Sequence, residues 1–248
     1  MKELLKKITE KLIPIRFQLA VRYLYLKITN KLDNEMFYVN KLLKRKRRFL
    51  DIGANVGIYS YYFKNTFENI VAFEPLKEIT YRLKSIQNNS LRIYNVALSN
   101  KIGECKFYIP VINGKIEPGL ASLEERNGEY KTRTVKVDKV DSYDFDDVDL
   151  IKIDVEGHEM HVIEGASKVI KKNMPILIIE IEQRHIKNKI EEVFQYILNL
   201  NYKGFFLKKG ELTTINKFKY EIDQKPYLKN VMVKEYINNF IFLPNKRN

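Results

Sequence analysis

Short continuous runs of apolar residues alternate along the chain with longer stretches in which apolar and polar positions follow a helical spacing. The runs 48–52, 69–73 and 148–153 are rich in Ile, Leu, Val and Phe, as is typical of strands buried on both faces of a sheet. Strand alternating with helix predicts a doubly wound α/β fold with a mostly parallel sheet. We expect further strands over 91–96, 175–181, 203–208 and 229–235, and helices over 57–67, 76–88, 158–171 and 188–200.

Two parts of the chain depart from this alternation. Residues 100–145 contain short β runs around a loop with glycine and proline, and we expect this insertion and the C-terminal region to shape an acceptor pocket. Residues 1–47 precede the first buried strand, and Leu4, Leu5, Ile8 and Leu12 are spaced for one helix face opposite several lysines. The sequence therefore predicts a basic helical extension over 1–47 and an α/β domain over 48–248.

The charge and the cysteine content limit the class of protein. The formal net charge is +13, and part of it lies in the run Lys44–Arg48 directly before the first strand. We interpret this run as a solvated connector, with a patch for anionic lipid, phosphate or nucleic acid as the alternative. No apolar run is long enough to cross a bilayer, no secretory signal is visible, and Cys105 is the single cysteine. We therefore expect a cytoplasmic protein.

A turn with two glycines follows the first buried strand, in the sequence Asp51-Ile-Gly53-Ala-Asn55-Val-Gly57. Gly53 lets the backbone approach a ligand closely, Asn55 tolerates a positive φ, and Gly57 permits tight packing where the next helix begins. Glu74 ends the second strand, where it can accept hydrogen bonds from two ribose hydroxyls. The pattern predicts a site for a cofactor that contains a nucleoside.

The residues of this turn also distinguish between cofactors. A dinucleotide-binding loop has the pattern G-x-G-x-x-G, whereas here Asn55 stands at the middle position and the glycines are four residues apart. The carboxylate of Asp51 would repel a pyrophosphate but suits a ligand with an ammonium and a sulfonium group. The turn therefore favours S-adenosylmethionine, and a nicotinamide dinucleotide is the alternative.

Ionisable residues gather at the end of the strand 148–153, where open α/β sheets bind their ligands. We predict that Asp154 orients or deprotonates an acceptor and that His158 is the second candidate base, since an imidazole titrates near neutrality. Glu180 ends the next strand and is the third catalytic candidate. Asp154 with Glu156 or Glu180 is a candidate Mg²⁺ site, because a bound cation would lower the pKa of a hydroxyl.

Several short motifs occur in a fixed order over residues 51–180, and the most specific is Lys152-Ile-Asp154-Val-Glu156-Gly-His158-Glu. With these motifs the chain resembles the FkbM-type S-adenosylmethionine-dependent methyltransferases. The resemblance implies a Rossmann-like class I methyltransferase fold. The other matching motifs are Asp51–Gly57, Phe73-Glu-Pro75, Asn95–Leu98, Ser122-Leu123, Glu164-Gly165 and Pro175–Glu180.

The resemblance also assigns roles to residues. It implies that Asp51, Gly53, Asn55 and Gly57 hold the methionine half of S-adenosylmethionine and that Glu74 binds the ribose. Asn95 or Ala97 would lie beside the adenine.

Known members of that family methylate hydroxyls of sugars and polyketides. The resemblance therefore implies an O-methyltransferase for a small molecule or glycan, above all a sugar of a surface polysaccharide. A lipid-linked acceptor would give the basic N-terminus a place at the inner face of the membrane. Nucleic acid is not an expected partner, because the Asn/Asp-Pro-Pro-aromatic element of base-amine methylation is absent at Asp154. The alternatives are an RNA ribose 2′-O-methyltransferase and a non-catalytic nucleoside-binding module.

Overall fold

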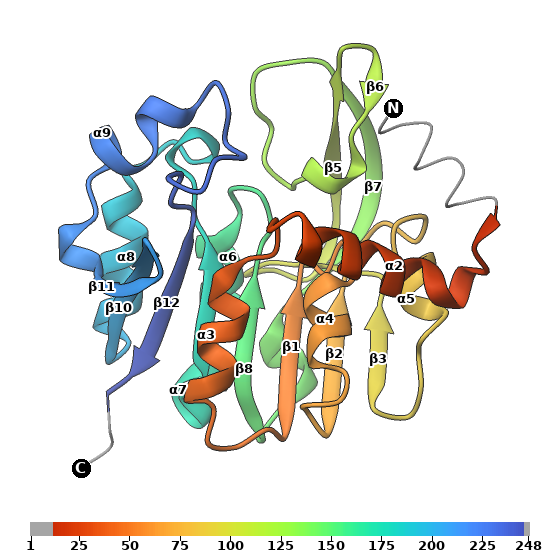
Figure 1. The fold of residues 1–248 in the computed structure, drawn as a ribbon, viewed down its shortest axis with the longest axis horizontal. Coiled ribbons are helices and arrows are strands. Elements are labelled where there is room, and N and C mark those ends of the chain that lie inside the picture. The colour runs from red at the N-terminus through yellow and green to blue at the C-terminus, as the bar shows by residue number, and fades with distance from the viewer. Residues whose placement is uncertain (1–11, 246–248) are drawn as a thin grey trace.

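A central sheet of eight strands organises the computed structural model, which describes residues 12–245. The strand order is β11-β10-β12-β9-β8-β1-β2-β3 (Figure 1). The strands from β9 to β3 in this order are parallel to one another, whereas β12 runs antiparallel between β9 and β10. The bounds are β1 Arg48–Ile52, β2 Asn69–Phe73, β3 Leu91–Tyr94, β8 Val148–Ile153, β9 Ile176–Glu180, β10 Tyr202–Lys208, β11 Glu211–Thr214 and β12 Asn239–Pro244.

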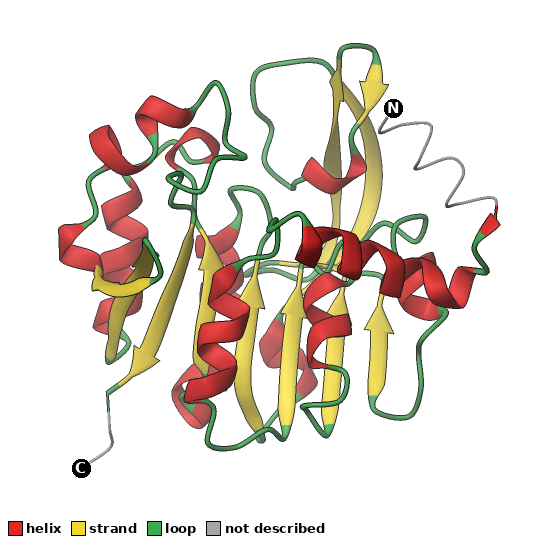
Figure 2. Ribbon diagram, viewed as in Figure 1, coloured by secondary structure: helices red, strands yellow, loops and turns green. Residues whose placement is uncertain are grey.

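Helices cover both faces of this sheet (Figure 2), as the alternation of strands and helices predicts. Successive strand residues face opposite sides, so Phe49 packs with the helices of one face and Leu50 with those of the other. Helices α2 Ile15–Ile28, α3 Asn34–Leu42 and α4 Ile58–Phe63 cover the first face. Helices α6 Glu159–Gly165, α7 Ser167–Asn173 and α8 Ile190–Asn199 cover the second. The doubly wound α/β fold is therefore confirmed.

A smaller sheet stands above the carboxyl ends of the central strands (Figure 1). Its main strands, β5 Gly103–Ile112 and β7 Tyr130–Asp138, pair in antiparallel fashion. Two short strands, β4 Ala97–Leu98 and β6 Lys115–Ile116, complete it. This is the predicted insertion, and its strands are longer than the apolar runs indicate.

The helices that precede β1 pack into the core of the α/β domain. Leu19 of α2 and Met36 and Val39 of α3 are fully buried in the same apolar cluster as Phe49. The predicted helix face at residues 4–8 lies outside the described residues. Within residues 12–245, no helix combines the length and the hydrophobicity needed to cross a bilayer.

Three expected elements are wrong in extent or kind. The helix expected over 76–88 is reduced to the four residues of α5 Tyr81–Lys84, and the helix over 158–171 is broken into α6 and α7. The strand expected over 229–235 is a series of turns. The remaining short elements are α9 Tyr220–Asp223 and the 3-10 turns η1 Pro118–Leu120, η2 Val140–Tyr143, η3 Gln183–His185, η4 Ile215–Lys217 and η5 Lys225–Tyr227.

Candidate active site

The glycine turn between β1 and α4 adopts the backbone conformations that its residues predict. Gly53, Asn55 and Gly57 have φ values of 74°, 51° and 88°. A Cβ at Gly53 would lie 1.8 Å from the carbonyl oxygen of Asp154, so glycine lets the end of β1 lie directly against the end of β8. Gly57 precedes α4, and a Cβ there would lie 2.6 Å from Cδ1 of Leu83. The turn is therefore fixed against two neighbouring elements.

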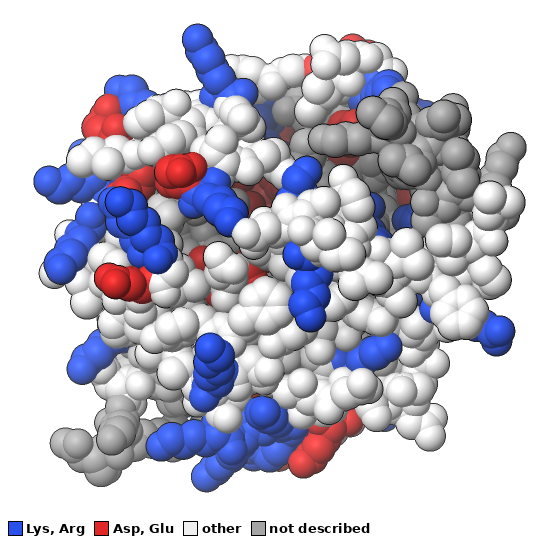
Figure 3. Space-filling view, in the orientation of Figure 1, with Lys and Arg blue, Asp and Glu red and all other residues white. Residues whose placement is uncertain are grey.

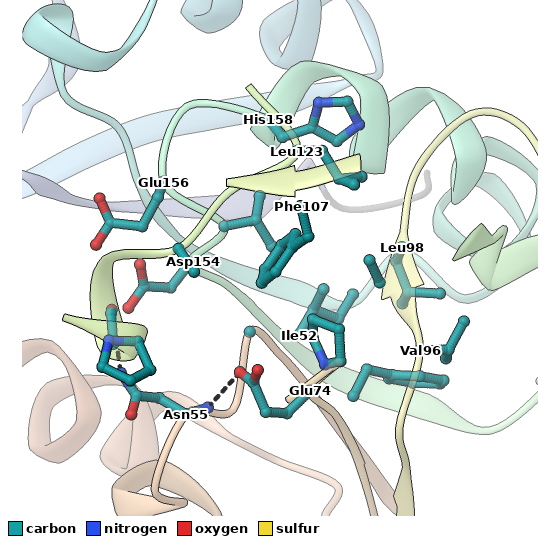
Figure 4. Close-up of a pocket in the computed structure, with 18 residues that line it drawn as sticks. Ile52, Asn55, Glu74, Val96, Leu98, Phe107, Leu123, Asp154, Glu156 and His158 are labelled. Atoms are coloured by element: carbon teal, nitrogen blue, oxygen red, sulfur yellow. Dashed lines mark hydrogen bonds between the residues drawn. The ribbon is translucent and has the colours of Figure 1, made fainter. Parts of the chain in front are cut away.

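A pocket opens beside this turn at the carboxyl edge of the sheet, and we call it the donor pocket (Figure 4). Its volume is about 550 Å³, including space open to solvent. The central strands and the insertion both contribute to its walls. It is lined by Ile52, Gly53, Asn55, Phe73, Glu74, Pro75, Val96, Ala97, Leu98, Phe107, Pro118, Gly119, Ala121, Leu123, Asp154, Val155, Glu156 and His158.

Glu74 is held rigidly in the wall of the donor pocket. Its Oε2 accepts a hydrogen bond from the backbone N–H of Asn55 at 3.1 Å, and its Oε1 accepts one from the N–H of Leu76 at 3.0 Å (Figure 4). Burial raises the pKa of Glu74 to about 7, although these two hydrogen bonds act in the opposite direction. A carboxylate can accept about four hydrogen bonds, so two acceptor positions remain for a ligand. The ribose-binding role of Glu74 stays a prediction, for which this arrangement leaves the required acceptor positions.

The structure separates the two residues expected beside the adenine. Ala97 lines the donor pocket between Val96 and Leu98. Asn95 does not line it; its side-chain amide donates to the carbonyl of Glu74 at 2.9 Å and to Oγ1 of Thr80 at 3.3 Å. Asn95 therefore supports the end of β2, and the apolar segment after it forms the wall.

Asp51 faces a second cavity on the other side of the glycine turn. This helix cavity lies between the turn and the segment α2–α3, and it shares Gly53, Asn55 and Asp154 with the donor pocket. Asp51 is 2% exposed, and its Oδ2 accepts from the backbone N–H and the hydroxyl of Ser60 at 3.0 and 2.6 Å. Burial raises the pKa of Asp51 to about 6. The predicted cofactor residues thus line two adjacent cavities, apart from Gly57 and Asn95, which line neither.

Lys152 is the main site residue that sequence reasoning missed. Its Nζ lies 3.7 Å from Oδ2 of Asp154 and 3.7 Å from Oε2 of Glu180, and it donates to Oδ1 of Asn239 at 3.0 Å. Burial lowers the pKa of Lys152, but the carboxylates around it outweigh this effect and raise the pKa to about 12. The available signal was a lysine in the apolar second half of a strand, between Ile151 and Ile153.

The position of Lys152 changes the interpretation of Glu180. Asp154 lines the donor pocket, whereas Glu180 lies behind the ammonium of Lys152 and is absent from the pocket lining. Oε1 of Glu180 accepts from the side-chain amide of Asn238 at 2.8 Å. A protein cation therefore already lies between two of the carboxylates that we considered as Mg²⁺ ligands.

Glu156, the third candidate metal ligand, lies near a different pair of groups. Its Oε2 is 3.1 Å from Nδ1 of His185, and Glu182 is close to both. The carboxylate of Glu182 is bound by Arg184 at 2.6 and 3.0 Å and by the hydroxyl of Tyr236. These residues do not provide an open set of oxygen ligands suited to Mg²⁺, and we derive no step through a metal.

His158 lines the donor pocket but has both ring nitrogens engaged. Nδ1 lies 2.6 Å from Oε1 of Glu124, and Nε2 lies 2.8 Å from Oγ of Ser99. The ring is buried and stacks on His161 at 4.3 Å between centroids. His158 therefore links the insertion to α6 and is a positioning residue in this arrangement, which makes it a weaker candidate for the base than Asp154.

The basic run before β1 lies away from both cavities. Arg47 pairs with Asp149 at 2.6 Å and Arg48 with Asp147 at 2.5 Å. These residues lie at or directly before the amino ends of β1 and β8, at the opposite edge of the sheet from the donor pocket (Figure 1). The ion pairs agree with the interpretation of this run as a connector.

The fold and the site together define a class I S-adenosylmethionine-dependent methyltransferase, with two antiparallel strands, β11 and β12, in an otherwise parallel sheet and an acid facing the pocket beside a glycine turn. The family model described as the methyltransferase FkbM domain matches residues 51–203. The chain belongs to this family. A comparison with curated proteins finds no match.

Solved structures match the chain at low sequence identity. Methyltransferase FkbM from Methylobacillus flagellatus matches with 14% identity and a TM-score of 0.50, over 96% of this chain and 57% of that one. This chain thus spans little more than half of that protein. The match to an rRNA methylase from Streptococcus thermophilus has 10% identity and a TM-score of 0.45, and it spans 86% of this chain and 95% of that one. The match to a TehB-like S-adenosylmethionine-dependent methyltransferase from Corynebacterium glutamicum has 10% identity and a TM-score of 0.48, and it spans 92% of this chain and 96% of that one.

Proposed function

We propose that the protein transfers a methyl group from S-adenosylmethionine to a hydroxyl of a sugar or of a related hydroxylated molecule, as in a surface polysaccharide. The observation that carries this proposal is the arrangement of carboxylates around the donor pocket. Glu74 is fixed at one wall, and Asp154 and Glu156 line the pocket just after the end of β8, with the Glu156 carboxylate pointing away from Glu74 (Figure 4). A ribose-binding acid and candidate proton acceptors thus line a single pocket.

The walls of the two cavities fit the parts of S-adenosylmethionine. Glu74 binds the ribose through its two free acceptor positions, and the apolar segment Val96–Leu98 with Phe107 surrounds the base. The helix cavity continues past Gly53 toward Asp51, whose buried carboxylate suits an ammonium group. When bound, S-adenosylmethionine supplies a methyl group activated by the sulfonium charge.

A hydroxyl acceptor needs a group that takes or orients its proton, because an alcohol is a weak nucleophile. Asp154 fills this role, since its side chain lies where the donor pocket and the helix cavity meet and is 33% exposed. Lys152, which also lines the helix cavity, holds the Asp154 carboxylate in place. Glu156 is the second carboxylate of the pocket, and burial raises its pKa to about 8.

A groove on the far side of the turn 156–158 is the candidate surface for the acceptor. Polar and charged side chains form most of its walls, and such walls suit a ligand with many hydroxyls. The residues include Arg126, Asn127, His161, Glu164, Lys187 and Asn188.

The test is methyl transfer from labelled S-adenosylmethionine to glycans, nucleotide-linked sugars and RNA. We expect transfer to a glycan hydroxyl by the wild type. Asp154→Asn is expected to keep donor affinity and to lose turnover by about 100-fold or more, as for removal of a general base. A larger loss in Glu156→Gln would identify Glu156 as the base.

Other outcomes of this test contradict the proposal. Transfer to RNA alone would favour the ribose 2′-O-methyltransferase, while donor binding without transfer to any acceptor would favour a non-catalytic module. Binding of NADH in place of S-adenosylmethionine would show that the glycine turn had been misinterpreted.

A further inference from the structure

Helix α2 carries an apolar stripe on the face that points away from the protein. Leu24 and Ile28 are 54% and 75% exposed, and the other members of the stripe are exposed as well. Their spacing of three and four residues places them on one side of an α-helix. The stripe consists of Phe17, Val21, Leu24, Tyr25 and Ile28.

The opposite face of α2 is already occupied by the protein. Leu19 is fully buried, and Leu26 packs against the same apolar cluster. The Tyr23 ring packs at a tilt against Tyr61 and stacks on Tyr62, both in α4, with ring centroids 5.3 and 6.3 Å apart. The exposed stripe is therefore not the face with which α2 packs against the core. A contiguous apolar stripe that the core does not use indicates an interaction surface.

Basic side chains lie beside this stripe. Arg16 and Lys27 lie along one side of it, and Arg22, which also lines the helix cavity, lies on the other. All three are exposed, and α2 contains no acidic residue. The surface over α2 is mostly white with isolated blue atoms in Figure 3, which agrees with this distribution. An apolar face with basic flanks is the pattern of a helix that lies in a membrane interface, where long basic side chains reach the headgroups.

We propose that α2 docks the protein on an anionic lipid bilayer, with the stripe inserted among the acyl chains and the basic flanks against the phosphates. The fourteen residues of α2 form a straight contact about 20 Å long. The C-terminal half of the same helix supplies Arg22 and Leu26 to the wall of the helix cavity. Docking would therefore bring the ligand-binding edge of the sheet to the bilayer, where a lipid-anchored acceptor is presented.

The experiment is flotation of the full-length protein with phosphatidylcholine vesicles that contain phosphatidylglycerol, against vesicles of phosphatidylcholine alone. We expect binding to the anionic vesicles that weakens at high ionic strength, because the basic flanks are screened. Leu24→Ser with Ile28→Ser is expected to reduce the vesicle affinity by about tenfold or more, since two large apolar groups no longer enter the bilayer. Retained S-adenosylmethionine affinity in this variant would show that its fold is intact.

Two matched variants make the result specific to α2. Ile102 and Met232 are 68% and 73% exposed and lie outside this helix, so Ile102→Ser with Met232→Ser should leave vesicle binding unchanged. Leu5→Ser with Ile8→Ser changes the segment before α2. If that pair abolishes vesicle binding and the α2 pair does not, the proposed surface is wrong.

The remaining outcomes overturn the proposal. If the wild type does not bind the anionic vesicles, the proposed membrane docking is wrong. A concentration-dependent dimer in sedimentation that the α2 variant abolishes, with no vesicle binding, would identify the stripe as an interface between two copies of the chain. None of these readouts depends on methyl transfer, so they remain interpretable if the proposed acceptor is wrong.

Discussion

The ammonium nitrogen of Lys152 lies 3.7 Å from Oδ2 of Asp154, and it is held in a position where only 2% of the lysine side chain is exposed. The same nitrogen contacts Glu180 and Asn239. A buried cation beside the carboxylate that faces both cavities stabilises the charge of that carboxylate and fixes its direction. Lys152 thus connects the stability of the fold to the geometry of the site.

Replacement of Lys152 by methionine should be strongly destabilising. The change leaves Asp154 and Glu180 with no cation between them, and loss of one partner of a buried ion pair costs about 3–5 kcal/mol. Urea unfolding should show this decrease in the free energy of unfolding. The double variant with Asp154→Asn should lose less than the sum of the single changes, and strict additivity would contradict the coupling.

Glu74→Gln should weaken S-adenosylmethionine binding while the fold stays intact. Glutamine keeps the shape but removes the charge that strengthens hydrogen bonds from two ribose hydroxyls, and such bonds contribute about 1.5–3 kcal/mol. We expect at least about a tenfold increase in Kd by calorimetry. Glu78→Gln, at a carboxylate that is 43% exposed, is the matched control. Equal affinity in both variants would exclude Glu74 from the site.

Gly53→Ala and Gly210→Ala should differ sharply in stability. Both glycines have positive φ, 74° and 83°, so the backbone strain of alanine is similar in the two variants. A Cβ at Gly53 would lie 1.8 Å from Asp154 O, whereas nothing lies within 4 Å at Gly210. Gly210→Ala should cost about 1–2 kcal/mol, and Gly53→Ala should cost considerably more or prevent folding. Similar melting temperatures would contradict the close approach of β1 and β8.

The buried carboxylate of Glu159 should make the protein less stable as the pH rises. Burial raises the pKa of Glu159 to about 7, although the N–H of Gly157 donates to it at 2.9 Å. Between about pH 4.5 and 7 the unfolded chain loses this proton while the folded chain keeps it, so the free energy of unfolding falls. This carboxyl lowers the free energy of unfolding by at most about 3 kcal/mol over that pH range.

Glu159→Gln removes this titration and should flatten the dependence of stability on pH over that range. Urea unfolding at a series of pH values measures the slope. Glu221→Gln, at a side chain that is 67% exposed, should leave the slope unchanged. Parallel curves for wild type and Glu159→Gln would show that this carboxyl does not titrate in the folded state as described.

The strands of the central sheet were predictable because short continuous apolar runs are typical of strands that are buried on both faces of a sheet. The runs 48–52, 69–73 and 148–153 became β1, β2 and β8 with the expected bounds. The turn at Gly53 was also predictable, since glycine at the end of a strand often marks a turn that needs a positive φ. Local sequence was therefore sufficient to predict those elements whose conformation depends on their own residues.

The helix expected over 76–88 shows where local sequence was not sufficient. Glu74 accepts a hydrogen bond from the N–H of Leu76, and Asn95 donates to Oγ1 of Thr80. These side-chain bonds hold the segment before Tyr81 in a turn, so the helix begins late and ends after four residues. The break between α6 and α7 has a similar cause, because Gly165 lies against the carbonyl of Ser99 and admits no larger residue.

The environment of Lys152 could not be predicted from local sequence either. Asn239, which accepts its hydrogen bond, lies 87 residues further along the chain. Sequence spacing identified Asp154 and Glu180 as neighbours at one sheet edge but gave no distance between their carboxylates and the lysine. The Mg²⁺ hypothesis arose from this missing information.

The position of β12 has a consequence for the order in which the protein is built. This strand follows all the others in the sequence, yet it lies between β9 and β10. A chain emerging from the ribosome that has reached only β10 leaves the edge of β9 unpaired and Lys152 without the oxygen of Asn239. Such an intermediate carries an open strand edge that invites pairing with other chains. The surroundings of Lys152, at the edge of the sheet beside the donor pocket, are therefore among the last parts of the molecule to be completed.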